Sequence, residues 1–205
     1  MNSPHPEKAF TLAEVLITAA IFSLVCGAIM TTMIAGLSSW RVSEAKIQIQ
    51  QDSRRAMQAM SQELRFSSSS GHLQILDDSG SAISTGTGSV IRFQVPLYTS
   101  QQIKLDSAGS KIWGGDSMEN YWICYKVVKA PEKDTGQLKR ILLDSNKNEV
   151  SSGSMVLANN IESVEFIGLP NNTYSPTSVQ IALTAANTKN VTTSLKSRVW
   201  LRNLN

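Results

Sequence analysis

Histidine and cysteine are scarce in this chain of 205 residues, which holds only two of each. With His5 and His72 as its only imidazoles, the sequence does not supply the ligands of a zinc cluster or a histidine-based catalytic triad. No glycine-rich phosphate loop follows a predicted strand. These shortages argue against an enzyme, and we expect no cofactor.

The two cysteines are poorly placed for a disulfide. Cys26 lies inside a long apolar run and Cys124 inside the predicted strand "YWICYKVV", so the region after the run has no second thiol. Cysteine usage therefore neither indicates nor excludes an oxidising compartment. We expect each cysteine to act as a small buried hydrophobe.

Charge of one sign is not concentrated in any part of the sequence. The formal net charge is +3, and residues 67–205 carry thirteen basic and eleven acidic side chains. Proteins that bind nucleic acids gather Lys and Arg in one block or on one face. The sequence therefore indicates no nucleic-acid partner.

One short segment gives the clearest suggestion of a metal site, since the other candidate, "DDSGS" at residues 77–81, is weaker and favours a turn. In "DSNKNE", Asp144, Asn146 and Asn148 alternate as in the start of a calcium loop. However, Glu149 occupies the place of the turn glycine and Met155 that of the final bidentate acid. The pattern favours an asparagine-rich turn without metal, and calcium binding stays the open alternative.

A long apolar run lies near the N-terminus. Val15 to Leu37 are 23 residues without a formal charge, which exceeds the roughly 20 needed to cross a membrane as a helix. Glu14 stands directly before the run. A carboxylate costs about 2.5 to 3.5 kcal/mol at the centre of a membrane helix and less near its edge, so a partner is expected for Glu14.

Two kinds of cleaved signal share these features. A secretory signal has an apolar core of about 7 to 15 residues and a small-x-small cleavage site, whereas this run is longer and continues into a helical pattern. A lipoprotein signal needs a leucine three residues before its cysteine and a small residue just before it, and "SLV" before Cys26 provides neither. A plain membrane anchor explains the length but leaves Glu14 and the polar leader "MNSPHPEKA" unexplained.

The stretch "KAFTLAEVLI" resembles the processing motif of type IV prepilins and pseudopilins: a short polar leader ending in lysine and a small residue, then Phe, Thr, Leu, any residue, Glu and an aliphatic run. The resemblance implies that a prepilin peptidase cuts between Ala9 and Phe10, so that residues 1–9 form a leader peptide. Phe10 would then carry the new, usually N-methylated, amine. Ala9 stands where glycine is usual, which leaves the efficiency of processing open.

The resemblance also implies a role for Glu14, which becomes the fifth residue of the mature chain. Its carboxylate would pair with the amine of a neighbouring subunit, because opposite charges attract strongly where the dielectric constant is low. Since both charges must lose their hydration, the pair is expected to set register and docking more than to add stability.

The positive-inside rule points in the opposite direction. More basic residues follow the run than precede it, and a literal count would place the head in the cytoplasm. We give precedence to the more specific motif and expect a single-pass protein of the bacterial inner membrane with its head in the periplasm or outside the cytoplasmic membrane. The charges counted are Glu7 and Lys8 before the run, and Arg41, Lys46, Arg54 and Arg55 after it.

Helical periodicity continues beyond the apolar run. One stripe of apolar or small residues recurs at steps of three and four, so we expect a long helix over residues 10–66 with a transmembrane segment at about 15–37. We expect the stripe to pack on the protein's own sheet rather than on a coiled-coil partner. Its members are Val42, Ala45, Ile49, Ser53, Ala56, Met60 and Leu64.

Residues 67–205 are predicted to form a β-rich periplasmic head, because short β-prone segments alternate there with turn-rich ones. The expected fold is α+β: a pilin-like long N-terminal α-helix, transmembrane in its first half, packed on an antiparallel β-sheet. The core should include the alternating residues Phe166, Val179, Ile181, Leu183, Val199 and Leu201. The predicted strands are "HLQIL", "SVIRFQVPL", "NYWICYKVV", "LKRILLD", "IESVEFIGL", "SVQIALTAA" and "TSLKSRVWLRN".

The head resembles, more loosely, the GspJ/PulJ kind of minor pseudopilin of type II secretion, through "GQLKRILL", "VLANNIESVEFIGL", "SVQIALTA" and "LKSRVWLRN". This implies a subunit of the tip or priming complex that supports protein export. The implied partners are other pseudopilins or pilins, the prepilin peptidase, the inner-membrane assembly platform and membrane lipid. A minor pilin for adhesion, motility or DNA uptake shares the motif, and a membrane-anchored binding module that never polymerises is the third hypothesis.

Overall fold

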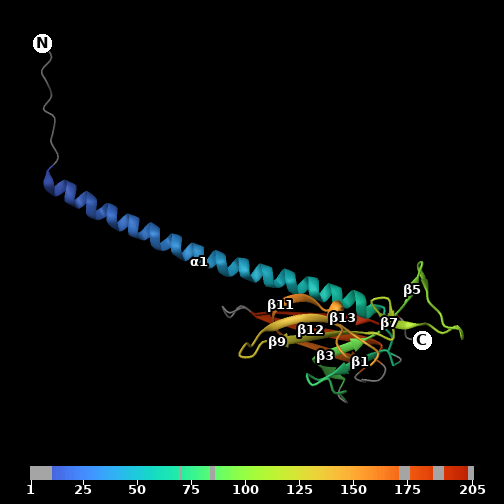
Figure 1. Cartoon of the computed structure of the whole chain (residues 1–205). Helices are drawn as coiled ribbons and strands as arrows, with labels where there is room; N and C mark the ends of the chain where they lie inside the picture. The colour runs from blue at the N-terminus through green and yellow to red at the C-terminus, as the bar shows by residue number, and fades with distance from the viewer. Residues whose placement is uncertain (1–10, 70, 84–85, 171–175, 187–191, 203–205) are drawn as a thin grey trace, which may run out of the picture. The chain divides into compact units, whose positions relative to one another are not determined.

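The computed structural model describes residues 11–69, 71–83, 86–170, 176–186 and 192–202. The chain forms two compact units, residues 1–44 and 45–205. The described residues form one long α-helix followed by antiparallel strands (Figure 1). The expected α+β, pilin-like architecture is therefore confirmed.

Helix α1 spans Leu12–Arg65, a length of 54 residues, which corresponds to about 81 Å at 1.5 Å per residue. No proline interrupts it, since the chain has none between Pro6 and Pro96. Its last turn tightens: the amide of Phe66 donates to the carbonyl of Glu63 at 3.1 Å, and that of Ser67 to Leu64 at 3.0 Å. Such three-residue bonds satisfy carbonyls at the end of a helix.

The part of α1 that belongs to the second unit packs on the sheet. This confirms the expected stripe from Ile49 onward, whereas its first members, Val42 and Ala45, are half-buried. The buried members are Ile49, Ser53, Ala56, Met60 and Leu64. The apolar members of this stripe join strand residues in one hydrophobic core. Because a fully buried Leu or Met contributes about 1.5 to 3 kcal/mol, this stripe fixes the helix to the sheet.

The main sheet is antiparallel, with strands in the order β1-β3-β9-β10-β11-β12-β13 and β2 paired with β11. It contains all seven strands expected from the sequence, although "SVIRFQVPL" also supplies a strand of a smaller sheet. The bounds are β1 (Leu73–Leu76), β2 (Thr87–Gly88), β3 (Val90–Phe93), β9 (Trp122–Lys129), β10 (Gly136–Leu143), β11 (Met155–Leu169), β12 (Ser178–Ala186) and β13 (Thr192–Trp200).

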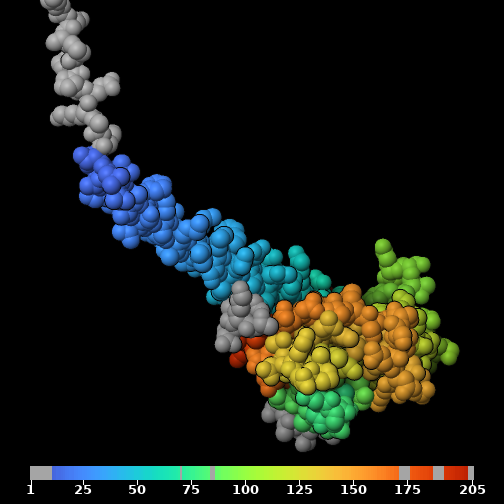
Figure 2. Space-filling view, turned by 60° about the vertical axis from the view of Figure 1, so that its left-hand side comes forward, coloured from blue at the N-terminus to red at the C-terminus, as the bar shows by residue number. Residues whose placement is uncertain are grey.

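Two small sheets and a short helix lie in the connections. The sequence did not predict most of these pieces, because strands of two or three residues carry too few side chains for a periodic pattern. In Figure 2 the light-green segment around β5 and β6 projects from the surface of the second unit. The pieces are β4 (Val95–Pro96), β7 (Trp113–Gly115) and β8 (Met118–Glu119), then β5 (Tyr98–Thr99) and β6 (Gln102–Ile103), and the 3₁₀ helix η1 (Ser151–Gly153).

Strand β11 joins the parts of the main sheet. Its first half pairs with β10, its second half with β2, and its other side with β12. A side chain at Gly88 would bring a Cβ within 2.2 Å of the carbonyl oxygen of Leu76. Glycine at this position therefore lets β2 lie against the end of β1.

The two faces of the sheet carry two cores. The larger core faces α1 and includes the six residues expected from alternation, Phe166, Val179, Ile181, Leu183, Val199 and Leu201, all of which are buried. The smaller core consists of Leu76, Val90, Cys124 and Ile141, with Leu143 against it. Successive side chains of a strand point to opposite faces, which explains why neighbours such as Cys124 and Tyr125 enter different cores.

Candidate functional site

The first turn of α1 closes on itself through Thr11 and Glu14. The Oγ1 of Thr11 accepts the amide of Glu14 at 3.3 Å, while Oε2 of Glu14 accepts the Thr11 amide at 2.9 Å and the Thr11 hydroxyl at 3.0 Å. This reciprocal arrangement is a capping box, which satisfies amides that have no partner within the helix. Ala9 and Phe10, the expected processing residues, lie outside the described residues.

Sequence reasoning named Glu14 but missed its capping role. The signal was present, because Thr-x-x-Glu before an apolar run is the sequence pattern of a capping box. The structure therefore gives Glu14 an intrachain partner, Thr11, at the point where the apolar segment begins.

The segment after Glu14 is one helix that is long and apolar enough to cross a membrane, with a mean hydropathy of 2.2 in its most apolar window. Every residue from 11 to 41 is exposed. The hydroxyls within this segment donate to carbonyls three or four residues earlier, as Ser23 does to Ala19 at 2.8 Å and Thr31 to Ala28 at 2.8 Å. A hydroxyl that is already hydrogen-bonded inside the helix needs no partner from lipid. The free-energy cost of moving that hydroxyl out of water is therefore smaller.

Cys26 corrects one expectation. It is exposed on α1, whereas Cys124 is buried. Nothing in residues 11 to 41 is covered by the described chain, so a thiol there has no core to enter. Burial raises the pKa of Cys124 to about 11, which keeps this thiol protonated and unreactive near neutral pH.

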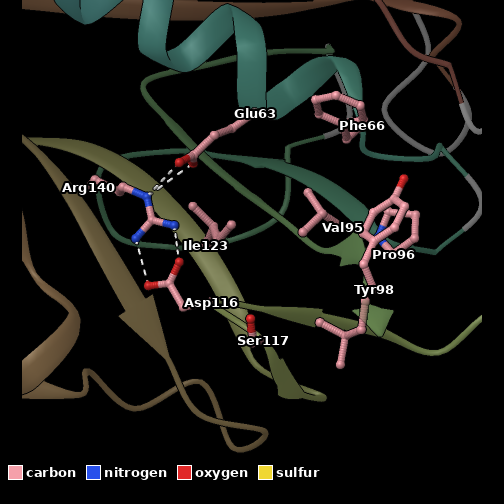
Figure 3. A pocket seen from close by; sticks show the side chains of 10 residues that line it. Glu63, Phe66, Val95, Pro96, Tyr98, Asp116, Ser117, Ile123 and Arg140 are labelled. Atoms are coloured by element: carbon pink, nitrogen blue, oxygen red, sulfur yellow. Dashed lines mark hydrogen bonds and ion pairs between the residues drawn. The ribbon is translucent and has the colours of Figure 1, made fainter. Parts of the chain in front are cut away.

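A polar cluster ties the end of α1 to the sheet (Figure 3). Arg140 of β10 is 7 % exposed, and its Nε lies 3.0 Å from both carboxylate oxygens of Glu63 on α1. Its Nη1 donates to Asp116 at 2.9 Å, and its Nη2 donates to the other oxygen of the same carboxylate. Tyr125 of β9 donates its hydroxyl to Glu63 at 2.6 Å. The cluster therefore links four separate segments.

The charge states in this cluster follow from its contacts. Burial alone would lower the pKa of Arg140, but the bonds to Asp116 and Glu63 outweigh it and raise that pKa. Burial and the negative charge of Glu63 raise the pKa of Tyr125. Arg140 stays positive and Tyr125 stays neutral, so neither group is poised to transfer a proton.

A cavity of about 490 Å³ lies beside the cluster. Figure 3 shows Glu63 and Asp116 around the guanidinium of Arg140, with Phe66, Pro96 and Tyr98 across the cavity. All three guanidinium nitrogens already bind carboxylates. The arrangement therefore works as a structural clamp rather than as a site that binds an anion.

The other chemically active side chains of the head also have structural contacts. His72 stacks on Trp113 with ring centroids 4.1 Å apart, and its Nδ1 lies 2.8 Å from Oε1 of Gln94. Asp144 accepts the amide of Asn148 at 2.8 Å, which closes the asparagine-rich turn. Within the part of the chain that the structure describes, no three His, Cys, Asp or Glu side chains gather in a way that could hold a metal ion.

Comparison with known proteins adds one finding. The prokaryotic N-terminal methylation motif matches residues 5–30, which include Glu14 and the start of the apolar segment. No curated protein matches the chain. The motif suggests a structural, non-enzymatic protein that works with other pilins and a prepilin peptidase, and together with the single apolar helix it fits a membrane-anchored protein. The matched motif supports the type IV prepilin and pseudopilin superfamily for this chain.

Proposed function

We propose that the protein is a minor pseudopilin that joins sibling subunits in the tip or priming complex of a type II secretion pseudopilus. The main support for this proposal is the methylation motif at residues 5–30, together with a long helix whose second half packs on an antiparallel sheet. In this proposal residues 1–9 are a leader, 10–66 the helix with its membrane segment at about 15–37, and 67–205 the periplasmic head of an inner-membrane protein.

Processing would change the electrostatics of the first turn. A cut between Ala9 and Phe10 creates a positive amine one residue before Thr11, the cap of α1. A positive charge at a helix N-terminus opposes the helix dipole. The carboxylate of Glu14, three residues after the cap, would offset that charge.

Glu14 would also serve assembly. Both hydrogen bonds from Thr11 go to Oε2, which leaves Oε1 for the Phe10 amine of a neighbouring subunit. In lipid this attraction is strong, but each charge must lose water, so the pair sets the register between helices.

Two other functions use the same features. A minor pilin of a type IV pilus differs in the machine it serves, and neighbouring genes separate the two: a secretin, an ATPase and several pseudopilins for secretion, against a retraction ATPase and a major pilin. A membrane-anchored module that never polymerises predicts no cut after Ala9 and tolerance of Glu14→Ala.

The first test is intact mass and N-terminal sequencing of the membrane-extracted protein, produced with and without a prepilin peptidase. With the peptidase we expect a chain that begins at Phe10 and carries about 14 Da for one methyl group. The matched variant Glu14→Ala should be recovered in the membrane but fail to crosslink to sibling subunits. A chain that still begins at residue 1 or 2 with the peptidase present would refute the proposal.

A further inference from the structure

One edge of the main sheet carries no further strand. Strand β13 pairs with β12 along its whole length, in unbroken register from Thr192 opposite Ala186 to Trp200 opposite Ser178. Among the described residues no strand pairs with its other side. The strand has nine residues, with neither proline nor bulge, so it retains the features that allow another strand to add.

The opposite end of the sheet is different. Strand β1 has four residues, and β2 lies against its end, where Gly88 is packed on Leu76. A short, partly covered edge is a poor template for another strand. The edge of β13 is therefore the better surface for β-strand addition.

A groove runs beside this edge. It has a volume of about 360 Å³ and lies between α1 and β13 within the second unit. Met57 and Leu195 supply its apolar side chains and Arg54 supplies a positive charge from α1. Lys196 also lines the groove, although it alternates with the α1-facing residues of β13. None of the described residues that line it is acidic. An added strand would place alternate side chains over Met57 and Leu195.

The other face of β13 is also basic. Lys196, Arg198 and Trp200 alternate with the α1-facing residues of the strand and are exposed. Arg198 lies over the ring of Trp200 at 4.5 Å and donates its Nε to Ser178 at 3.0 Å. Glu165 shares a row with Lys196, but β12 lies between their strands. Arg54 on the α1 side, and Lys196 and Arg198 on the other face, therefore place positive charge on both sides of the free edge.

We infer that β13 accepts an extended segment of a sibling subunit as an added strand, in which apolar side chains facing the groove alternate with acidic side chains facing Lys196 and Arg198. The identity of the occupant as a sibling rests on the proposed function. Recognition would combine backbone hydrogen bonds, which give affinity, with alternate side chains, which give specificity.

A second copy of the chain is a poorer occupant. In antiparallel pairing of two β13 strands centred on residue 196, Lys196 stands opposite its equivalent. Centred on residue 197, it stands opposite Arg198. Like charges directly opposite each other destabilise a sheet, so these registers favour a different, acidic strand.

The test uses the full-length protein in zwitterionic detergent and two fluorescent nine-residue peptides that alternate valine with glutamate or valine with lysine. Fluorescence anisotropy gives the Kd of each. We expect the glutamate peptide to bind about ten-fold more tightly, and hydrogen exchange to slow at the amides of residues 192–200. Equal affinities, or protection confined to other strands, would overturn the inference.

Two matched variants carry the same change of charge. Lys196→Glu with Arg198→Glu should reverse the preference toward the lysine peptide, whereas Lys133→Glu with Lys147→Glu, both on exposed turns, should retain the original preference. An equal shift in both variants would reduce the effect to net charge and refute a specific edge site. Concentration-dependent dimers blocked by the glutamate peptide would identify a second copy as the occupant and refute the sibling.

These outcomes separate the inference from the function on which it rests. If the chain begins at Phe10 but does not bind the glutamate peptide, only the inferred site at the edge of β13 is refuted. A chain that is not processed but binds the peptide at β13 keeps the edge site, and its occupant is then not a sibling pilin.

Discussion

The two halves of α1 share a backbone conformation but differ in what covers their apolar side chains. In the first half, Phe22 and Leu24 are 68 % and 75 % exposed, whereas Met60 and Leu64 in the second half are fully buried. The first half is held by its own hydrogen bonds and the second also by the sheet. The difference teaches that helical periodicity identifies a face to be covered, while the covering partner can be the protein itself, lipid or another helix.

The strongest way to sharpen this comparison is to remove one leucine from each half. Leu64→Ala leaves a cavity in the core and should lower the free energy of unfolding of the head by about 2 to 5 kcal/mol. Leu24→Ala, the matched control, should leave it unchanged, because Leu24 touches no core. Guanidinium unfolding in detergent, followed by tryptophan fluorescence, measures both. An equal loss of unfolding free energy in the two variants would contradict the conclusion that only the second half of α1 is part of the core.

The cysteines offer a second comparison. In a Cys26→Ser background, Cys124 should react with N-ethylmaleimide at pH 8 about 100-fold more slowly in the folded than in the unfolded protein. The reason is that burial raises its pKa from 9.0 to about 11, and only the thiolate reacts. Mass spectrometry over time gives both rates. Similar rates would mean that the smaller core opens readily.

The clamp at the end of α1 should have a smaller effect. Arg140→Leu leaves Glu63 and Asp116 without their shared cation, and we expect a loss of about 1 to 3 kcal/mol, because both carboxylates keep some contact with water. Adding Glu63→Gln should recover part of it. The control Lys104→Leu removes an exposed ion pair with Glu119 and should cost about 0 to 1 kcal/mol. If Arg140→Leu and Lys104→Leu lowered the stability to thermal unfolding equally, the stabilising role of the Arg140 cluster would be contradicted.

The smallest effect is expected at the cap. Thr11→Ala removes an acceptor and a donor of the capping box and should cost about 0.5 to 2 kcal/mol of local helix stability. Thr11→Ser should retain most of it. Hydrogen exchange of the amides in the first turn measures the change, and the unfolding of the head should stay constant. Faster exchange in the head as well would show that the two halves are coupled.

Patterns within short segments predicted much of the fold. The apolar run, the stripe from Ile49 to Leu64 and the alternation in β12 follow from neighbours on the chain, and the structure confirms them. The capping box was equally local but was not recognised. Strand β11 begins at Met155, whereas the predicted strand begins at Ile161. The additional residues are mostly exposed and include Asn159 and Asn160, a residue type that is depleted in strands, and they are ordered by pairing with β10.

The clamp could not be predicted in the same way. Glu63 and Arg140 are 77 residues apart, and Asp116 reaches Arg140 from a turn that carries no pattern of its own. Each of these side chains taken alone resembles a solvated surface charge. Only the packing of α1 on β9 and β10 brings them within bonding distance.

The sequence by itself determined the helix, the approximate positions of the seven longer strands and the length of the apolar segment, because helix and strand periods are properties of consecutive residues. It also contained the N-terminal methylation motif at residues 5–30, whose residues are consecutive. Only the tertiary structure decided which strands pair, which edge of the sheet carries no further strand and which charges are buried together. These depend on contacts between distant segments, whose choice is set when the second unit closes around its two cores.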